Sequence, residues 1–252
     1  MPACCRKQQG VARAALEGLY AAGSGLRAAY QAEQVLANDA ANASTSGFME
    51  SIPGAIPWNP MMEAVTGAGG PLPLGTLPGG TAGKTVLDQT PGALDPSRNT
   101  LSMGLGALLV SVRTPGGVRY SRAGSYLTNA AGQIVTPAGY PVLDRAGRPV
   151  QVTPGARFTA TGSVVSANGK VLGQVALYMI GAPVNVGGGL VMGAARLAPA
   201  TARVVPLATE ESNVNLSVVT SDLILAQRAL QADAQAIQAE NAAAQQAEQQ
   251  VG

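Results

Sequence analysis

Residues 78–85 (PGGTAGKT) come closest to a recognisable chemical motif, because they nearly spell a phosphate-binding loop. Such a loop needs glycine at its first position, and Pro78 stands there instead. It also needs a buried strand before it, whereas the residues before this run are rich in Gly and Pro. The run therefore predicts a linker and not a nucleotide site.

Other catalytic chemistries lack the residues they need. The chain has no His, which excludes Ser-His-Asp and Cys-His catalysis and His-based metal sites. Cys4 and Cys5 alone are too few ligands for zinc. The run Gly187-Gly188-Gly189 with Gly193 has the wrong spacing for a dinucleotide loop, and it predicts a turn between strands. We expect no catalytic residue, no cofactor and no metal.

The charge is uneven although the formal net charge is only +2. Between residues 96 and 205, Asp144 is the one acidic residue, so a pair of carboxylates for glycoside hydrolysis is missing. The basic residues of that range are Arg98, Arg113, Arg119, Arg122, Arg145, Arg148, Arg157, Lys170, Arg196 and Arg203. Such a surface could bind nucleic acid or an acidic neighbour, but the scatter of these residues and the scarcity of aromatics disfavour nucleic acid.

The sequence gives no signal for a membrane span or an ordinary secretory leader. Its longest apolar runs, such as residues 105–110, are too short to cross a bilayer. The N-terminus lacks a long apolar run followed by a small-residue cleavage site. We therefore expect no membrane insertion.

The last forty residues carry a seven-residue apolar repeat that predicts a long helix. The first set of repeat positions is Leu216, Leu223, Leu230, Ile237, Ala244 and Val251. The second set, three residues later, is Val219, Ala226, Asp233, Glu240 and Ala247. A repeat of seven keeps one stripe facing a partner along a supercoiled helix. Because the stripe is thin and rich in Ala, the helix needs something to pack against.

The start of the chain supplies a candidate partner. From about residue 11 to residue 43 there is no Pro, and apolar residues recur at helical spacing. The face that this spacing predicts consists of Leu16, Leu19, Gly23, Leu26, Tyr30 and Ala37, with Glu33 interrupting it. We expect the basic N-terminal arm and the acidic C-terminal arm to pack together, with exposed ion pairs adding only a weak bias.

The middle of the chain has a different composition. Residues 48–84 are full of Gly and Pro and predict a connecting segment. Residues 85–208 contain short apolar runs separated by turns, including Asn168-Gly169, a strong hairpin signal. The expected strands lie at residues 108–112, 118–122, 125–128, 133–135, 140–143, 149–152, 163–165 and 171–180. We predict an α+β fold in which residues 1–47 and 209–252 form helical arms, packed together like a coiled coil, around an antiparallel β-rich domain.

Three blocks of residues resemble one known family. The first is residues 36–48 (LANDAANASTSGF), and the second is residues 120–126 (YSRAGSY), followed by residues 139–143 (GYPVL). The third is residues 211–216 (ESNVNL) with residues 226–232 (AQRALQA). Together they resemble the bacterial flagellar axial proteins, and the length favours the rod proteins within that group. The chain departs from the family pattern where Asp39 and Asp233 replace Asn.

The resemblance implies a structural, non-enzymatic subunit of a helical tube, with terminal helices in an inner layer and the β-rich domain outside. It implies export through the flagellar export apparatus (type III export) without a cleaved signal, and location in the basal body. The implied partners are further copies of the chain and other rod or hook proteins. The residues predicted for helix and subunit packing are Leu16, Leu19, Leu26, Tyr30, Asn38, Asn42, Asn213, Leu216, Leu223, Gln227, Arg228, Leu230 and Ile237. A hook subunit, or an oligomeric β-domain adhesin with a C-terminal coiled coil, remains the alternative.

Overall fold

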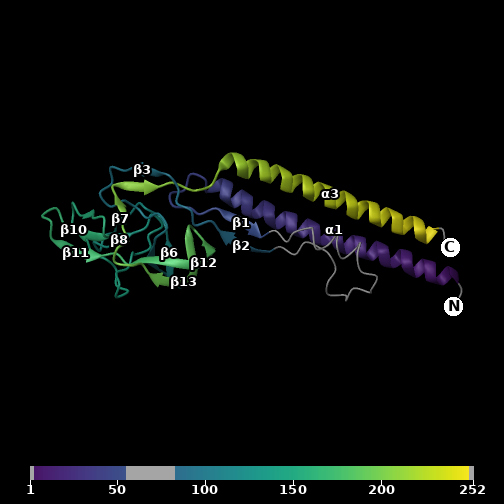
Figure 1. The fold of residues 1–252 in the computed structure, drawn as a ribbon, viewed down its shortest axis with the longest axis horizontal. Helices are drawn as coiled ribbons and strands as arrows, with labels where there is room; N and C mark the ends of the chain where they lie inside the picture. The colour runs from purple at the N-terminus through teal and green to yellow at the C-terminus, as the bar shows by residue number, and fades with distance from the viewer. Residues whose placement is uncertain (1–2, 55–82, 250–252) are drawn as a thin grey trace. The chain divides into compact units, whose positions relative to one another are not determined.

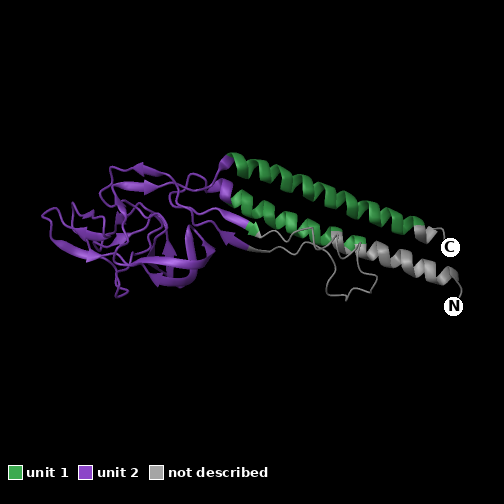
Figure 2. Ribbon diagram, in the orientation of Figure 1, with its two compact units in different colours: residues 1–38, 53–84, 217–252 green, residues 39–52, 85–216 purple. Residues whose placement is uncertain are grey.

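The computed structural model describes residues 3–54 and 83–249, and the surroundings of side chains 18–19, 22–53 and 85–246. Two compact units make up the chain (Figure 2). The helical unit consists of residues 1–38, 53–84 and 217–252. The β-rich unit consists of residues 39–52 and 85–216. Most of the predicted connecting segment, residues 55–82, lies outside the described residues, as does the phosphate-loop-like run up to residue 82.

Two long helices dominate the helical unit (Figure 1). Helix α1 spans Ala3–Ala41 and helix α3 spans Leu216–Gln249. Both contain many Ala and Gln residues and no Pro, so intrinsic propensity agrees with the observed structure. Helix α1 also contains Gly18, Gly23 and Gly25. Glycine is a poor helix former, so each of these residues lowers the intrinsic stability of the helix.

The two helices lie side by side and run in opposite directions (Figure 1). The Gln227 side chain of α3 donates a hydrogen bond of 3.2 Å to Glu33 of α1. On α3, the buried or half-buried side chains beyond Leu216 are those on the predicted stripe, namely Val219, Leu223, Ala226, Leu230, Asp233, Ile237 and Glu240. All other described side chains of α3 in residues 217–246 are exposed.

The residues of α1 that are seen beside α3, namely Gly18, Gly25 and Glu33, are not the apolar ones of the predicted face. The half-buried positions of α1 at matching spacing are small residues, namely Gly18, Ala22, Gly25, Ala29 and Ala32, and the row continues to the buried Leu36. Of the predicted face, Leu19 and Leu26 are half-buried, whereas Gly23, Ala37 and Tyr30 are exposed, the last to 54%. The Leu16 side chain lies outside the described side chains.

The β-rich unit contains a four-stranded barrel in the order β12-β13-β6-β5. Its strands are β5 Leu109–Thr114, β6 Gly117–Ser121, β12 Leu177–Gly187 and β13 Leu190–Leu197, and every neighbouring pair is antiparallel. The predicted turn at Gly187–Gly189 joins β12 to β13, and the first hairpin turns where Thr114 pairs with Gly117. The predicted turn between strands at Gly187–Gly189 is confirmed.

A series of tight turns follows β6. Glycines with positive φ recur every seven or eight residues, at Gly132, Gly139, Gly147, Gly155, Gly162 and Gly169. At five of these turns the glycine N–H donates to the carbonyl three residues earlier, as from Gly147 to Asp144 at 3.0 Å. This pattern is a turn closed by a residue in the left-handed region, which glycine adopts without strain. The short strands between are β7 Leu127–Thr128, β8 Ile134–Val135, β9 Arg157–Phe158, β10 Ser163–Val165 and β11 Val171–Gln174.

Backbone hydrogen bonds join three of these repeats to one another in a ring. The N–H of Ile134 donates to Val150, that of Val150 to Val142, and that of Val142 to Ile134, at 2.9–3.0 Å. All three side chains are at most 3% exposed and lie in the main core cluster. The stretches 140–143 and 149–152 therefore form isolated bridges in place of the predicted strands, because Pro141 and Pro149 cannot donate to a ladder and each bridge changes partner within two residues.

Short strands from distant parts of the chain complete the unit. Strands β3 Leu94–Pro96 and β15 Ala208–Glu210 are paired, as are β4 Met103–Gly104 and β14 Val205–Pro206. A further pair joins β1 Ser51–Gly54 to β2 Gly83–Leu87. The beginning and end of the β-rich unit are thus tied together, and the predicted α+β class with antiparallel strands is confirmed. Among the described residues, no helix combines the length and the hydropathy that crossing a bilayer requires.

Candidate functional site

Arg122 is the centre of the most tightly bonded polar site in the β-rich unit. Its side chain is 1% exposed, just after strand β6. The guanidinium donates to the carbonyls of Gly47 (3.4 Å) and Phe48 (3.1 Å), which follow helix α1 in the chain. It also donates to the carbonyls of Gln89 (3.3 Å) and Thr90 (3.0 Å). One side chain thereby fastens two segments that are about forty residues apart.

Glu210 balances the charge of Arg122. Its carboxylate is fully buried and lies 3.4 Å from Nε of Arg122. The same carboxylate accepts hydrogen bonds from the N–H groups of Gly92 (3.0 Å) and Gly106 (2.7 Å). Burial lowers the pKa of Arg122, while Glu210 and Asp88 act in the opposite direction. Because both charges are paired and hydrogen-bonded, the site is stable only as a complete set.

Asn213 extends this site toward the start of α3. Its Oδ1 accepts a hydrogen bond of 2.8 Å from the N–H of Glu50. Its Nδ2 donates to the carbonyls of Asp88 (3.0 Å) and Thr90 (3.1 Å). A single amide therefore joins the segment after α1, the segment after β2 and the lead into α3.

Asp39 and Gly47 fix the path of the chain just after helix α1, so that it passes beside Arg122. The buried Asp39 carboxylate accepts a hydrogen bond of 2.8 Å from the N–H of Ser51. Gly47 has φ +69°, and a Cβ at this position would overlap the carbonyl oxygen of Arg122. Only glycine meets both conditions. We call the set Asp39, Gly47, Phe48, Arg122, Glu210 and Asn213 the junction.

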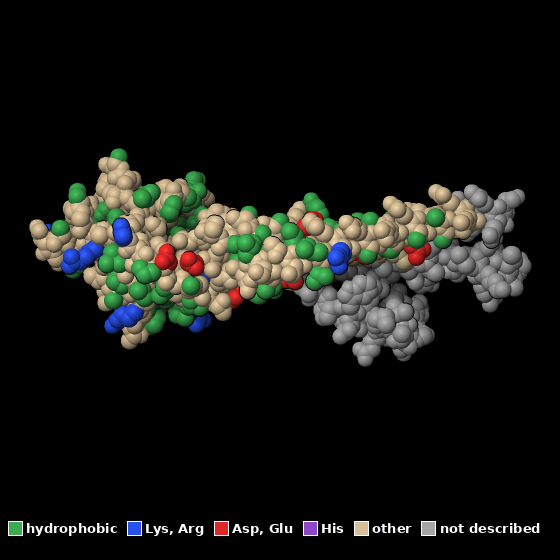
Figure 3. Space-filling model, turned by 90° about the horizontal axis from the view of Figure 1, so that it is seen from above, with side chains coloured by type: hydrophobic (Ala, Val, Ile, Leu, Met, Phe, Trp, Pro, Cys, Tyr) green, Lys and Arg blue, Asp and Glu red, His purple; other side chains and the backbone are tan. Residues whose placement is uncertain are grey.

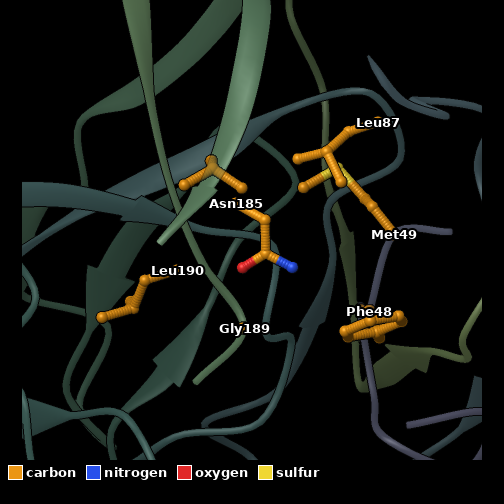
Figure 4. Close-up of a pocket in the computed structure, with 8 residues that line it drawn as sticks. Phe48, Met49, Leu87, Asn185, Gly189 and Leu190 are labelled. Atoms are coloured by element: carbon orange, nitrogen blue, oxygen red, sulfur yellow. The ribbon is translucent and has the colours of Figure 1, made fainter. Parts of the chain in front are cut away.

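The junction holds backbone segments and offers no reaction centre. The side chains of Arg122, Glu210 and Asn213 bond to one another or mainly to main-chain groups, and no nucleophile stands beside a base within this set. No group of His, Cys, Asp and Glu among the described residues has the geometry to hold a metal ion. A small hollow beside it lies between Phe48, Met49 and Leu87 on one side and Asn185 and Leu190 on the other (Figure 4). It has room for about one water molecule, so it is too small for a cofactor.

The predicted packing residues fall into three groups. Asn213 lies in the junction, with the contacts given above. Leu19, Leu26, Leu223, Leu230 and Ile237 are half-buried on α1 and α3. Tyr30, Asn38, Leu216, Gln227 and Arg228 are exposed, and the half-buried Asn42 accepts a hydrogen bond of 3.2 Å from the Thr45 hydroxyl. The role of the exposed group in contacts between subunits stays a prediction.

Sequence reasoning did not assign a role to Arg122 or Glu210. Arg122 lies within a block of residues that carries the family resemblance, and Glu210 directly precedes another. The resemblance was traced from Glu211, but the structure buries Glu210 and leaves Glu211 exposed. The available signal was positional, because Arg122 is the single charged residue of the block 120–126 and Glu210 directly precedes the block that begins at Glu211.

The basic residues of the β-rich unit are spread over its surface. On the face drawn in Figure 3, Lys and Arg side chains lie at separate places on this unit and do not form one patch. Arg148 makes an ion pair within the unit, with Asp144 at 3.3 Å. On this face there is therefore no continuous basic stripe of the kind that binds nucleic acid.

A family model matches part of the β-rich unit, and known proteins align with this sequence over most of its length. A family model described as "Flagellar hook protein FlgE/F/G D1 domain" matches residues 106–173, which include Arg122 and the repeated turns. A flagellar basal-body rod protein FlgF of Rhizobium meliloti is 31% identical over 222 residues, covering 84% of this chain and 88% of the relative. The chain belongs to the FlgF family of flagellar basal-body rod proteins.

Two more relatives carry the same description. The FlgF rod protein of Mesorhizobium japonicum is 28% identical over 225 residues, covering 85% of this chain and 89% of the relative. That of Caulobacter vibrioides is 28% identical over 152 residues, covering 57% and 58%. The resemblance to the rod and hook group that the three blocks carried is thereby confirmed.

Proposed function

We propose that this chain is a structural subunit of the flagellar rod, which polymerises with further copies and with other rod or hook proteins into a helical tube that transmits torque. Its place would be the basal body, outside the cytoplasm, reached through the flagellar export apparatus without a cleaved signal. Family membership supports the rod role. The observation that supports assembly through the helices is a second stripe on α3.

This second stripe lies on an exposed face of α3 that differs from the face of the first stripe. It also repeats every seven residues, and it consists of Val218, Leu225, Ala229, Ala232, Ala236, Ala239 and Ala243, with Asp222 between the first two. All these side chains are exposed, Val218 to 49% and Leu225 to 60%. Two stripes at heptad spacing on one helix suit a layer in which each helix has neighbours on two sides.

Contacts of this kind link unlike surfaces of successive copies. A heterologous contact that does not close on itself generates an open helical filament. Within each copy, α1 and α3 would pack in a coiled-coil manner along the first stripe. The junction would then hold the segments next to both helices against the β-rich unit, so that force on the helical arms reaches the β-rich unit through bonded main chain.

Substitutions at two exposed alanines test the assembly stripe. Ala232→Asp places a charge on the second stripe, whereas Ala234→Asp places the same charge on a different exposed face two residues away. Both changes carry the same helix-propensity cost, so they isolate the surface effect. We expect Ala232→Asp to block polymerisation and motility in a strain that lacks the native gene, and Ala234→Asp to retain both.

Electron microscopy and light scattering of the full chain provide the readout. Tubes or polymers from the unchanged chain, and discrete monomers from Ala232→Asp, would support the proposal. A closed trimer would instead favour an oligomeric binding module. Equal assembly by the two variants would contradict the role of this stripe.

A further inference from the structure

The seam between α1 and α3 contains two acidic side chains, and each of them faces a glycine. A Cβ added to Gly25 would lie 2.8 Å from Oδ2 of Asp233, and one added to Gly18 would lie 2.6 Å from Oε1 of Glu240. Both separations are shorter than real Cβ contacts, so an added methyl group would push the carboxyl end of the acidic side chain out of its present position. The two glycines are one heptad apart on α1, and the two acids are one heptad apart on α3. The pairs therefore repeat along the seam in opposite chain directions.

The glycines are explained by the carboxyl groups they face. Glycine in the middle of a helix is unfavourable compared with alanine, so its presence needs a reason. At Gly23, on the exposed side of α1, a Cβ would meet nothing within 4 Å. At Gly18 and Gly25 the space is already filled by the acid of the other helix. The seam thus contains two notches, each shaped for one carboxyl group.

Asp233 occupies its notch without a cation. The charged side chains nearest to it along α1 are Arg27, which is exposed, and Glu33, which bonds to Gln227. Along α3 they are Arg228, also exposed, and Glu240 in the next notch. Within the described part of the chain, no ion pair or hydrogen bond joins any of them to Asp233. Burial accordingly raises the pKa of Asp233 above its ordinary value.

We propose that the two glycine–acid steps fix the register of the α1–α3 pair, and that the proton on Asp233 sets how strongly the pair holds. If α3 moved by one heptad so that Asp233 faced Ala32, the methyl group would fill the notch. In the native register a charged Asp233 must lose water without gaining a cation, which weakens the pair. A protonated Asp233 fills the same space without that cost. This inference concerns the free chain and does not depend on polymerisation.

The sign of the pH effect follows from the raised pKa. An acid whose pKa is higher in the folded than in the unfolded state stabilises the folded state most when it is protonated. The helix pair is therefore strongest below the ordinary pKa of aspartate. It loses that stability as the pH rises through the raised pKa of Asp233, and it is weakest above that value.

A set of alanine variants of the full chain tests the register lock. The thermal transition of the helices is followed by circular dichroism at 222 nm. Gly23→Ala, the control, should raise the melting temperature by about 2–4 °C, because alanine favours the helix and the site is open. Gly25→Ala should lower it, because the methyl group meets Asp233. In a chain that carries Asp233→Ala, Gly25→Ala should raise it, as at the control site.

The reversal of sign between the two backgrounds is decisive. If Gly25→Ala stabilises the unchanged chain as much as Gly23→Ala does, the notch has no energetic role and the inference is wrong. If Gly25→Ala stays destabilising after Asp233→Ala, the glycine serves another contact and the inference is also wrong.

The proton dependence has its own measurement. Lowering the pH from 7 toward the ordinary pKa of aspartate should raise the melting temperature of the helices in the unchanged chain, or increase their signal if they are partly unfolded at neutral pH. In Asp233→Asn the neutral-pH value should be higher than in the unchanged chain, and the dependence on pH should be smaller. An Asp233→Asn variant with the pH dependence of the unchanged chain would overturn the proposal, as would a chain without helix at either pH.

Discussion

Glu210 and Asp233 are both acids in packed surroundings, one in the β-rich unit and one in the helical unit. Glu210 has a guanidinium at 3.4 Å and two backbone N–H donors, and it is fully buried. Asp233 faces a glycine in a half-buried seam and has a raised pKa. A buried charge whose bonds are complete is costly to disturb, whereas a charge without a partner weakens the contact it sits in. The comparison indicates that the junction resists disruption, whereas the strength of the helix pair depends on the protonation of Asp233.

Breaking the junction should have the largest effect. Arg122→Met keeps most of the volume but leaves Glu210 buried without its cation, and it removes four hydrogen bonds to main-chain carbonyls. Removing one partner of a buried ion pair costs about 3–5 kcal/mol. We expect a loss of that size in the free energy of unfolding of the β-rich unit, measured by urea titration of the full chain.

Arg148→Met is the matched control. Its side chain is 77% exposed and pairs with Asp144, so the variant should lose at most about 1 kcal/mol. If Arg122→Met were no more destabilising than Arg148→Met, the junction would not be the rigid part of the comparison.

The next effect concerns the glycine that receives Arg122. Gly47→Ala should destabilise by more than about 2 kcal/mol, because a positive φ costs an L-residue about 1–2 kcal/mol and the new methyl group would overlap the Arg122 carbonyl. Gly139→Ala has φ +84° at the native site but open space around the Cβ, so it should show the conformational cost alone. Urea titration of both variants measures the difference. Equal losses would show that the contact with Arg122 adds nothing.

The features that depend only on residues close together in the chain, such as helix periodicity and tight turns, were predictable from the sequence. From Val219 to Glu240 the heptad stripe of α3 coincides with its covered side, since periodicity is a property of one helix. The Asn168-Gly169 turn joins two paired strands, because its preference for positive φ needs no distant partner. The face of α1 was predicted less well, since Gly and Ala carry little hydropathy signal and the side chains of α3 decide which of them are covered.

The junction could not be derived in this way. Arg122 and Glu210 are 88 residues apart, and each alone resembles an ordinary surface charge. Their burial depends on the pairing of β3 with β15, and no periodic pattern in the sequence predicts that pairing. Asn213 was selected from the family resemblance, and its three bonds to main-chain groups show why an amide fits there: it must accept from one group and donate to two others.

The smallest effect is expected at one of the repeated turns. The Asp144 carboxylate accepts hydrogen bonds of 2.8 Å from the N–H groups of Arg148 and Ala146, and these bonds, the one from Arg148 first, lower its pKa. An acid with a lowered pKa stabilises the folded state above its ordinary pKa, and that stability is lost as the pH falls through the lowered value. Asp144→Asn keeps one acceptor oxygen and loses the charge, so we expect a loss below about 1 kcal/mol at pH 7. Between pH 5 and pH 2 the unchanged chain should lose its advantage over this variant, and urea titration at several pH values measures it. An advantage that persisted at pH 2 would mean that the side chain acts through shape and not through its charge, which would place this turn with the fixed contacts of the junction.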